Sequence, residues 1–261
     1  TFYLRNASSN RTIIRQLVEG TPAYHKVTIP EGSRLEEIAA VLKSELDIDV
    51  EEFLEMCRSD EVAENFDLPG PTLEGYLFPE TYFFTEEMTA KEIIEQMTKQ
   101  YRAIMTRETL DLAKEKGLSE LELVTLASII EGEAILDDER TTISAVYHNR
   151  LNIGMKLQAD PTLQFIHGDS PKRLSNKDKK IDSPYNTYLY KGLPPGPINS
   201  PGEASIQAAV NPADVEYLFF VAKGDGSHVF SRTEKEHLKA KREFDKIRRR
   251  VSRERQKRGE G

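Results

Sequence analysis

Two glutamates, Glu131 and Glu133, follow a segment in which nearly every residue is apolar. The segment LSELELVTLASII predicts a helix that is buried on most sides, with Ser119 and Glu122 forming a capping box at its start. A carboxyl group at the end of such a helix faces the negative end of the helix dipole and loses hydration, and both effects disfavour its charged form. A carboxyl group that keeps its proton near neutral pH suits acid catalysis at a glycosidic oxygen. This argument from the residues applies to Glu131 and Glu133 alike, and both are candidates for the role.

A second group of polar and aromatic residues follows in the loop-rich part of the chain, between residues 155 and 205. Tyrosine rings stack on pyranose faces, and amides bond to hydroxyl and N-acetyl groups. The same residues would also be expected in an irregular loop whose polar groups satisfy its own backbone. The predicted sugar-binding residues are Gln158, Asp160, Thr162, Tyr185, Asn186 and Tyr188.

Several other chemistries find no support in the sequence. The five histidines show no metal-ligand spacing, and no G-x-S-x-G nucleophile motif is present. His228 either faces a cleft or is a structural histidine. The net charge of −8 argues against nucleic acid as a partner, and the single cysteine excludes an intramolecular disulfide. We therefore predict no metal and no cofactor.

The first part of the chain predicts a small unit after a polar lead-in at residues 1–22. Residues 23–87 read as strand, helix, helix, strand, with Ser33 and Asp49 as helix caps. The returning strand lies in TLEGYLFPETYFF, which contains Glu74 and Glu80. These two glutamates either line a cleft or tie two subdomains together.

Residues 88–261 predict a larger α+β domain. Helical spacing covers 88–117, 119–131 and a segment ending near Gly154, and a short helix fits EASIQAAVNP. VEYLFFVAK and SHVFSRT flank a Gly-Asp-Gly turn and predict a β-hairpin. A basic helical tail follows at 233–258, and the fold class is α+β.

Several segments together resemble one known family. LEGYLFPETYFF, LASIIEGEA, VYHNRLNIGMKLQADPT, YNTYLYKGLPPGPINSPG and VEYLFFVAKGDGSHVFS are similar to the endolytic murein transglycosylases, also called YceG-like. The matching blocks run in the family's order from about Tyr24 to His237. The resemblance implies that residues 23–87 form a LysM-like, glycan-binding subdomain and that the rest is the catalytic domain.

The resemblance also implies a function and a place of work. Members of the family cut nascent peptidoglycan strands internally, need no cofactor, and are held by a single N-terminal helix on the outer face of the cytoplasmic membrane. That helix is not among these 261 residues. The family's catalytic glutamate matches Glu131, which would protonate the oxygen between MurNAc and GlcNAc and then accept a proton from the MurNAc C6 hydroxyl. The product is a 1,6-anhydroMurNAc end, and peptidoglycan synthases are expected as partners.

Three alternatives stay open at this stage. Many helices end in exposed, solvated glutamates, which is the simpler interpretation of Glu131. A lysozyme-like hydrolase would add water across the same bond, with Asp160 as a second carboxylate. A glycan-binding scaffold that recruits cell-wall synthases would need no catalytic group.

Overall fold

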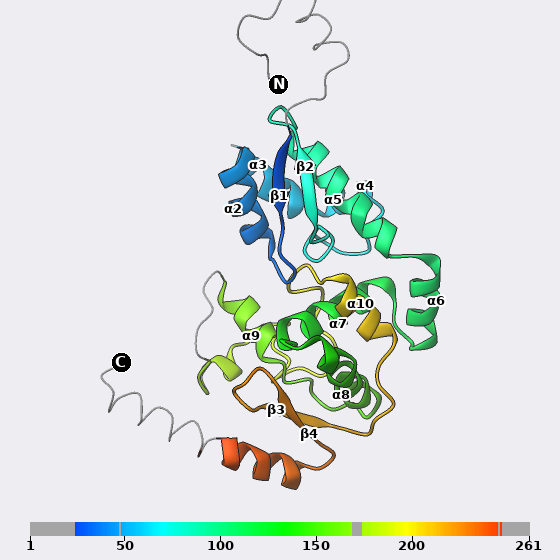
Figure 1. Cartoon of the computed structure of the whole chain (residues 1–261), viewed down its shortest axis with the longest axis vertical. Coiled ribbons are helices and arrows are strands. Elements are labelled where there is room, and N and C mark those ends of the chain that lie inside the picture. Colours follow the sequence, from blue (N-terminus) through cyan, green and yellow to red (C-terminus); the bar gives the residue numbers. More distant parts are fainter. Residues whose placement is uncertain (1–23, 47, 169–173, 245, 247–261) are drawn as a thin grey trace, which may run out of the picture. The chain divides into compact units, whose positions relative to one another are not determined.

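The computed structural model describes residues 24–46, 48–168, 174–244 and 246 (Figure 1). Contacts divide the chain into two compact units. The first holds the described residues of Thr1–Arg107 together with Ile198–Gly202, and the second holds those of Glu108–Pro197 and Glu203–Gly261. The predicted boundary after residue 87 therefore differs from this division, because helix α5 (Ala90–Ile104) packs on helix α3 (Val50–Cys57) of the first unit. The predicted lead-in at residues 1–22 lies outside the described residues.

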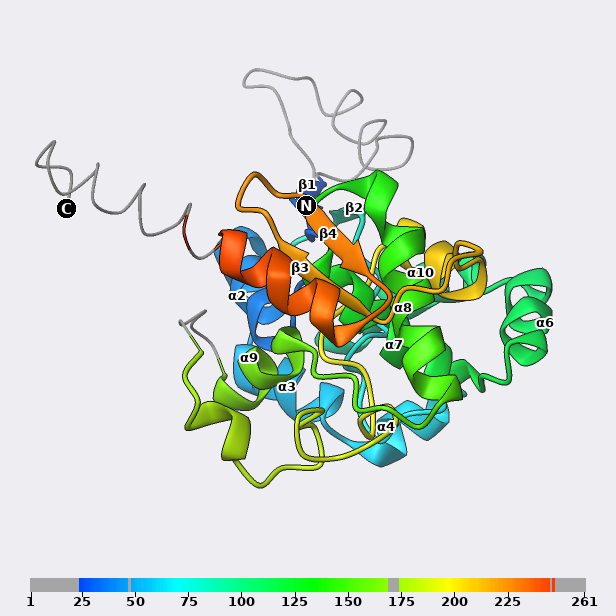
Figure 2. The same cartoon turned by 90° about the horizontal axis from the view of Figure 1, so that it is seen from below.

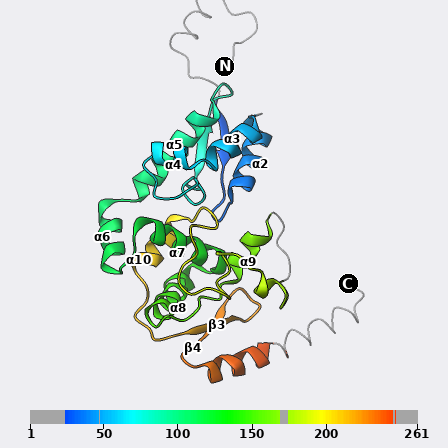
Figure 3. The same cartoon turned by 180° about the vertical axis from the view of Figure 1, so that it is seen from behind.

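The first unit is built on two short antiparallel strands, β1 (His25–Thr28) and β2 (Thr81–Phe84), in which Val27 lies opposite Tyr82. Helices α2 (Leu35–Leu46), α3 and α4 (Asp60–Asn65) come between the strands in the chain. The expected strand-helix-helix-strand order omitted α4, a single short helix with Ser59 as its cap. Figures 1 and 3 show α2 on one side of the strand pair and α5 on the other.

The long helix expected over residues 88–117 is two helices. The first, α5, begins at a capping box of Thr89 and Glu92, and its capping residue is Met105. The second, α6 (Arg107–Glu115), begins two residues later. The interruption coincides with the division between the two units, which a pattern of apolar spacing does not reveal.

The second unit has a buried helix, α7 (Glu120–Glu133), at its centre. Every residue from Leu123 to Ile130 is buried, and the expected capping box of Ser119 and Glu122 is present. The neighbours of α7 are α8 (Arg140–Asn152), α9 (Asp160–His167) and α10 (Glu203–Val210). Short 3₁₀ turns, η1 (Asp137–Glu139) and η2 (Asp178–Lys180), complete the loops.

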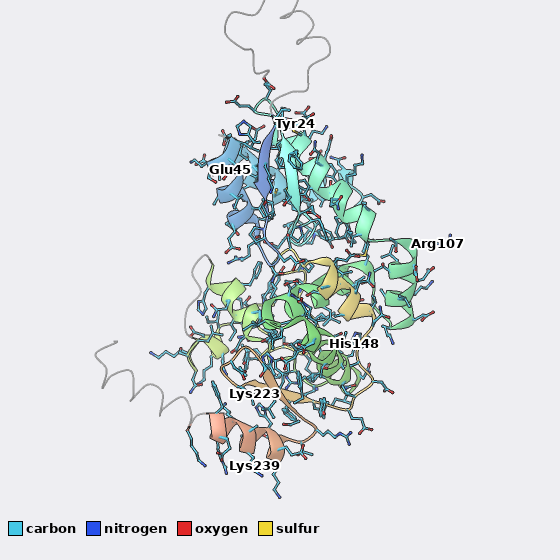
Figure 4. The ribbon with its side chains drawn as sticks, in the orientation of Figure 1. Tyr24, Glu45, Arg107, His148, Lys223 and Lys239 are labelled. Carbon is cyan, nitrogen blue, oxygen red and sulfur yellow. The ribbon has the colours of Figure 1, made fainter. Side chains whose placement is uncertain are left out.

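The predicted hairpin at the Gly-Asp-Gly turn is confirmed. Strands β3 (Phe219–Ala222) and β4 (His228–Ser231) pair with Phe220 opposite Phe230, and β3 packs on α8. Residues 234–244 of the predicted tail are helical and lie across the hairpin (Figure 2). Lys223 and Lys239, labelled in Figure 4, line the groove between the hairpin and this helix. Among the described residues, no helix combines the length and apolar character needed to cross a bilayer.

Glu74 is a buried carboxyl group in the first unit. It accepts a hydrogen bond from the backbone amide of Leu35, the first residue of α2, and so caps that helix from a distant part of the chain. The expected cap, Ser33, instead donates its hydroxyl to the Pro30 carbonyl at 2.6 Å. Glu74 is 7% exposed, and its Oε1 has no hydrogen-bond partner among the described residues.

Burial of Glu74, with a smaller contribution from the nearby Glu36 carboxylate, raises its pKa to about 8, while Arg34 opposes the shift. We predict that Glu74→Gln makes the protein's thermal stability less dependent on pH. In the unfolded chain this carboxyl ionises near pH 4.5, but in the folded protein it keeps its proton to about pH 8. Wild-type stability should fall as pH rises through that window, by up to roughly 1.4 kcal/mol per pH unit.

Calorimetric melting from pH 4.5 to 8 measures the difference. The control is Glu80→Gln, because Glu80 is exposed in the same segment and bonds only locally, to the amide of Thr81 at 2.8 Å. Equal pH slopes for wild type and Glu74→Gln would contradict the assignment of a protonated Glu74.

Candidate functional site

Glu133, the last residue of α7, holds its carboxyl group among donors from two other helices. The Tyr147 hydroxyl of α8 donates to Oε1 at 3.0 Å, and the backbone amide of Asp160 at the start of α9 also donates to the carboxyl group. Burial, with a smaller contribution from the Asp160 carboxylate, raises the pKa of Glu133 to about 7. The two hydrogen bonds and the Arg150 charge oppose this shift. Glu133 therefore exchanges a proton near neutral pH, as a general acid/base requires.

The amide of Asp160 reaches Glu133 because α9 lacks a cap of its own. The N-cap position is Ala159, which has no side-chain acceptor, and a proline lies in the first turn. The first amides of a helix have no partner inside the helix, so an acceptor must come from elsewhere. The Glu133 carboxyl group supplies it, and this bond aligns the end of α7 with the start of α9.

Asp160 carries a second carboxylate beside this group. Its Oδ1 accepts a hydrogen bond of 2.5 Å from the Tyr188 hydroxyl, and the Lys179 ammonium lies 4.4 Å from the centroid of the Tyr188 ring. Burial, together with the bond to Asp160, raises the pKa of Tyr188 well above its ordinary value, so the phenol remains a donor. Asp160 and Tyr188, two of the predicted sugar-binding residues, thus lie near Glu133.

Arg150 is a buried cation that holds the chain leading into α9. Its Nε donates to the Leu218 carbonyl and its Nη1 to the Leu157 carbonyl, each at 2.6 Å. Its guanidinium also lies 5.3 Å from the centroid of the Phe219 ring. By joining α8, the loop before α9 and the start of the hairpin, Arg150 sets the position from which Asp160 meets Glu133.

Two of the predicted sugar-binding residues have a structural role instead. Thr162 is fully buried, donates to the Ala159 carbonyl at 2.8 Å and lies 3.0 Å from the Thr187 hydroxyl. Asn186 is also fully buried, donating to the Ile181 carbonyl and accepting from the Tyr188 amide. Neither side chain can reach a ligand in this arrangement, and Asn186 acts by placing Tyr188.

The other two predicted loop residues lie nearer the surface. Gln158 is exposed and has a φ of 51°, a conformation that non-glycine residues adopt at a cost and that is frequent at functional sites. A hydrogen bond of 3.1 Å from its amide to the Thr187 carbonyl maintains this conformation. Tyr185 is half-buried, and its ring packs on Phe165 with centroids 4.8 Å apart. Gln158 thus keeps a side chain that is available to a ligand beside Asp160.

Glu131 lies on a different side of α7, because two residues along an α-helix correspond to a rotation of roughly 200°. Its Oε1 is 3.1 Å from Nη1 of Arg140, and the same Nη1 is 2.5 Å from the Ser205 hydroxyl. Arg140 also contacts Asp137 at 3.0 Å. The Glu131 side chain is only 7% exposed, as expected, but its neighbour is a guanidinium rather than the apolar surroundings on which the prediction of an uncharged Glu131 depended.

The remaining candidate residues have partners other than Glu133. The Glu139 carboxylate accepts a hydrogen bond of 2.9 Å from the backbone amide of His228 and lies 2.7 Å from Nδ1 of the same residue. These contacts of the buried histidine anchor β4 to the start of α8. Glu74 and Glu80 belong to the first unit, where Glu74 caps α2 and Glu80 bonds to its neighbour Thr81. The described residues contain no group of three or more His, Cys, Asp and Glu side chains able to hold a metal ion.

Comparison with known proteins identifies the family of the chain. The model of the YceG-like family matches residues 1–243. This chain belongs to the YceG-like family. A crystallised yceG-like protein of Listeria monocytogenes superposes with a TM-score of 0.76 at 34% sequence identity, over 91% of this chain and 83% of the other.

Curated relatives of this YceG-like chain carry an activity in their names. A Bacillus subtilis (strain 168) protein named endolytic murein transglycosylase is 38% identical over 260 residues, which cover 93% of this chain and 72% of that protein. A Streptococcus pneumoniae (strain D39) protein of the same name is 29% identical over 271 residues, or 90% of this chain and 48% of that protein. The chain thus spans about half the length of its streptococcal relative.

Sequence reasoning about this YceG-like chain missed two residues of the site, Tyr147 and Arg150. Both lie in the helix VYHNRLN, and both are buried in the structure. A tyrosine and an arginine on a mostly buried helix need partners for their polar ends. That requirement was the available signal, but it did not indicate which partners they would find.

For the YceG-like chain we predict that Glu131→Gln is mainly a stability variant. It removes the negative charge beside Arg140 and leaves that buried guanidinium with the largely exposed Asp137 as its remaining acidic contact. We expect a loss of roughly 1–3 kcal/mol in the free energy of unfolding, measured by urea denaturation at pH 7. Glu203→Gln, an exposed glutamate in the first turn of α10, is the control. An unchanged unfolding midpoint for Glu131→Gln would show that the ion pair contributes nothing.

Proposed function

We propose that this chain is an endolytic murein transglycosylase, which cuts peptidoglycan strands between MurNAc and GlcNAc with Glu133 as its general acid/base. The names of its relatives support the activity and the substrate. The observation that favours Glu133 over Glu131 is its position among two hydrogen-bond donors, with a pKa raised to about 7 by burial. Glu131, in contrast, is ion-paired with Arg140.

The first step uses the protonated form of Glu133. Its proton passes to the glycosidic oxygen, the bond from that oxygen to MurNAc C1 breaks, and the GlcNAc end leaves as an alcohol. The positive charge that develops at C1 is relieved by the carbonyl oxygen of the MurNAc N-acetyl group. The Tyr147 hydroxyl and the Asp160 amide both point at the carboxylate that remains on Glu133, and they stabilise it as it forms.

The second step uses that carboxylate as a base. Glu133 takes the proton of the MurNAc C6 hydroxyl, and the C6 oxygen attacks C1. The product carries a 1,6-anhydroMurNAc end, and Glu133 regains the proton that it needs for another turnover. One carboxyl group therefore serves both steps, and no water is consumed.

The proposal places the protein at the outer face of the cytoplasmic membrane, where nascent glycan strands are found. A membrane-spanning helix that precedes these residues would hold it there, with synthases as partners and with a LysM-like first unit to bind glycan. Glycan binding by the first unit can be tested by size-exclusion assays. These would compare the binding of purified glycan strands to the wild-type protein and to variants of exposed residues in that unit.

A lysozyme-like hydrolase is the second candidate, and one observation favours it. Asp160 places a second carboxylate beside Glu133, and ordinary glycosidases use such a pair to activate water or to attack the sugar. The two reactions differ in their products by one water, so the chemistry of the new ends separates them.

Digestion of purified glycan strands tests the function and the assignment together. We expect the wild-type protein to yield 1,6-anhydroMurNAc ends by mass spectrometry, because the C6 hydroxyl replaces water. Glu133→Gln should lower the rate at least about 10²-fold, whereas Glu131→Gln, measured per folded molecule, should retain most of it. Reducing ends from the wild-type protein would support the hydrolase. An active Glu133→Gln beside an inactive, folded Glu131→Gln would return the role to Glu131.

Removing the Tyr147 hydroxyl should shift the pH dependence of cleavage. The hydrogen bond from Tyr147 lowers the pKa of Glu133, the Asp160 carboxylate raises it, and the Arg150 charge lowers it. Tyr147→Phe therefore raises the pKa of Glu133, and the alkaline limb of the pH–rate profile should move to higher pH with a lower maximal rate. Tyr190→Phe is the matched control, since Tyr190 is an exposed tyrosine that donates to Asp182 at 2.6 Å. A profile for Tyr147→Phe that coincides with the wild type would contradict the contact's catalytic importance.

A further inference from the structure

The side chain of Asp160 has no role in either step of the proposed reaction. The backbone amide of Asp160 donates a hydrogen bond to the Glu133 carboxyl group, so the Asp160 side chain starts close to the acid/base. The residue is exposed, and Tyr188 holds Oδ1 at 2.5 Å. Among the described residues, Oδ2 has no hydrogen-bond partner. An exposed carboxylate with one oxygen held and the other without a partner among the described residues can accept a hydrogen bond from a ligand.

We propose that Asp160, oriented by Tyr188, accepts a hydrogen bond from the N–H of the MurNAc acetamido group and stabilises the cyclic oxazolinium ion that forms during cleavage. This inference rests on the proposed function. It gives the second carboxylate a task that differs from the activation of water.

The chemistry of the reaction supports this task. When the glycosidic bond breaks, its electron pair stays on the departing oxygen, which receives the Glu133 proton. The acetamido carbonyl oxygen bonds to C1, and the positive charge spreads over the ring that includes the acetamido nitrogen. A carboxylate that accepts from this N–H stabilises the ion more than the neutral substrate, so it lowers the barrier. The N–H proton stays on nitrogen throughout.

The second step reverses the charge without another reactant. The C6 oxygen attacks C1, its proton goes to Glu133, and the bond from C1 to the acetamido oxygen breaks. The neutral acetamido group is restored, and Asp160 returns to its starting state. Asp160 touches only the acetamido N–H, and atoms and charges balance over the two steps.

Two features of the site favour this role over attack by Asp160 on the sugar. The 2.5 Å bond from Tyr188 occupies one oxygen and draws charge away from the carboxylate, which weakens it as a nucleophile. Asp160 also lies in the first turn of α9, where the helix dipole favours a negative side chain. Both features hold a fixed, charged acceptor in place.

The test compares binding of the thiazoline derived from MurNAc with binding of MurNAc itself. With a proton on its ring nitrogen, the thiazoline is a stable analogue of the oxazolinium ion and carries the N–H that Asp160 would accept. Isothermal titration at about pH 5 is well below the pKa of about 7 to which burial raises the Glu133 carboxyl group, and Asp160→Asn leaves that burial in place although it removes the smaller effect of the Asp160 charge. We expect the wild-type protein to prefer the thiazoline by about 10²-fold. Asp160→Asn should lose most of that preference while its affinity for MurNAc changes little.

The matched control is Asp182→Asn, because Asp182 is an exposed aspartate that accepts from a tyrosine hydroxyl in the same way, at 2.6 Å from Tyr190. It should keep the wild-type preference. Tyr188→Phe should retain part of the preference, since it removes the orientation of Asp160 but not its charge. In cleavage assays Asp160→Asn should lower kcat by about 10²-fold with KM nearly unchanged.

The outcomes separate this inference from the function on which it depends. A wild-type protein that forms anhydro ends, together with an Asp160→Asn variant that keeps the thiazoline preference and kcat, would overturn the role of Asp160 alone. A wild-type protein that does not cleave glycan, or that leaves reducing ends, would overturn the proposed function itself. A misfolded Asp160→Asn would leave the decision to Tyr188→Phe, whose preference must then fall below that of the wild type.

Discussion

One constraint shapes the second unit where three helices meet, namely that the half-buried Glu133 keeps its carboxyl group away from bulk water. A carboxyl group in that position is costly unless its oxygens are hydrogen-bonded. The Tyr147 hydroxyl and the Asp160 amide provide those bonds, and they tie the end of α7 to α8 and α9. The same contacts hold the group near its point of proton exchange, so stability and reactivity come from one arrangement.

Other buried polar groups near Glu133 are also satisfied by hydrogen bonds within the unit. Arg150 is buried, and burial lowers its pKa, but the backbone carbonyls of Leu157 and Leu218 accept hydrogen bonds from its guanidinium. Thr187 accepts from the amide of Ala159 at 2.9 Å and holds the loop against α9. These bonds are made by residues that a ligand cannot reach, which explains why a polar loop contains both contact residues and purely structural ones.

Two glutamates two positions apart have different surroundings because of helix geometry. Glu131 faces Arg140, whose guanidinium also bonds to Ser205, and Glu133 faces Tyr147 and Asp160. The sequence placed both at the end of a buried helix, and the structure confirms that position. Which of the two suits the role of acid/base depends on the residues that surround each carboxyl group. Those residues are at least 9 positions away in the chain from Glu131 and at least 14 from Glu133.

The amino-acid sequence alone determined the local features: the buried helix α7 with its capping box, the hairpin at Gly-Asp-Gly, the Asp49 cap and the α+β class. Each depends on residues a few positions apart, whose effects are local. Only the tertiary structure decided the division of helix 88–117, the capping of α2 by Glu74, and the environment of each carboxyl group. These features depend on partners that are distant in the chain, because burial and charge act through space and not along the sequence.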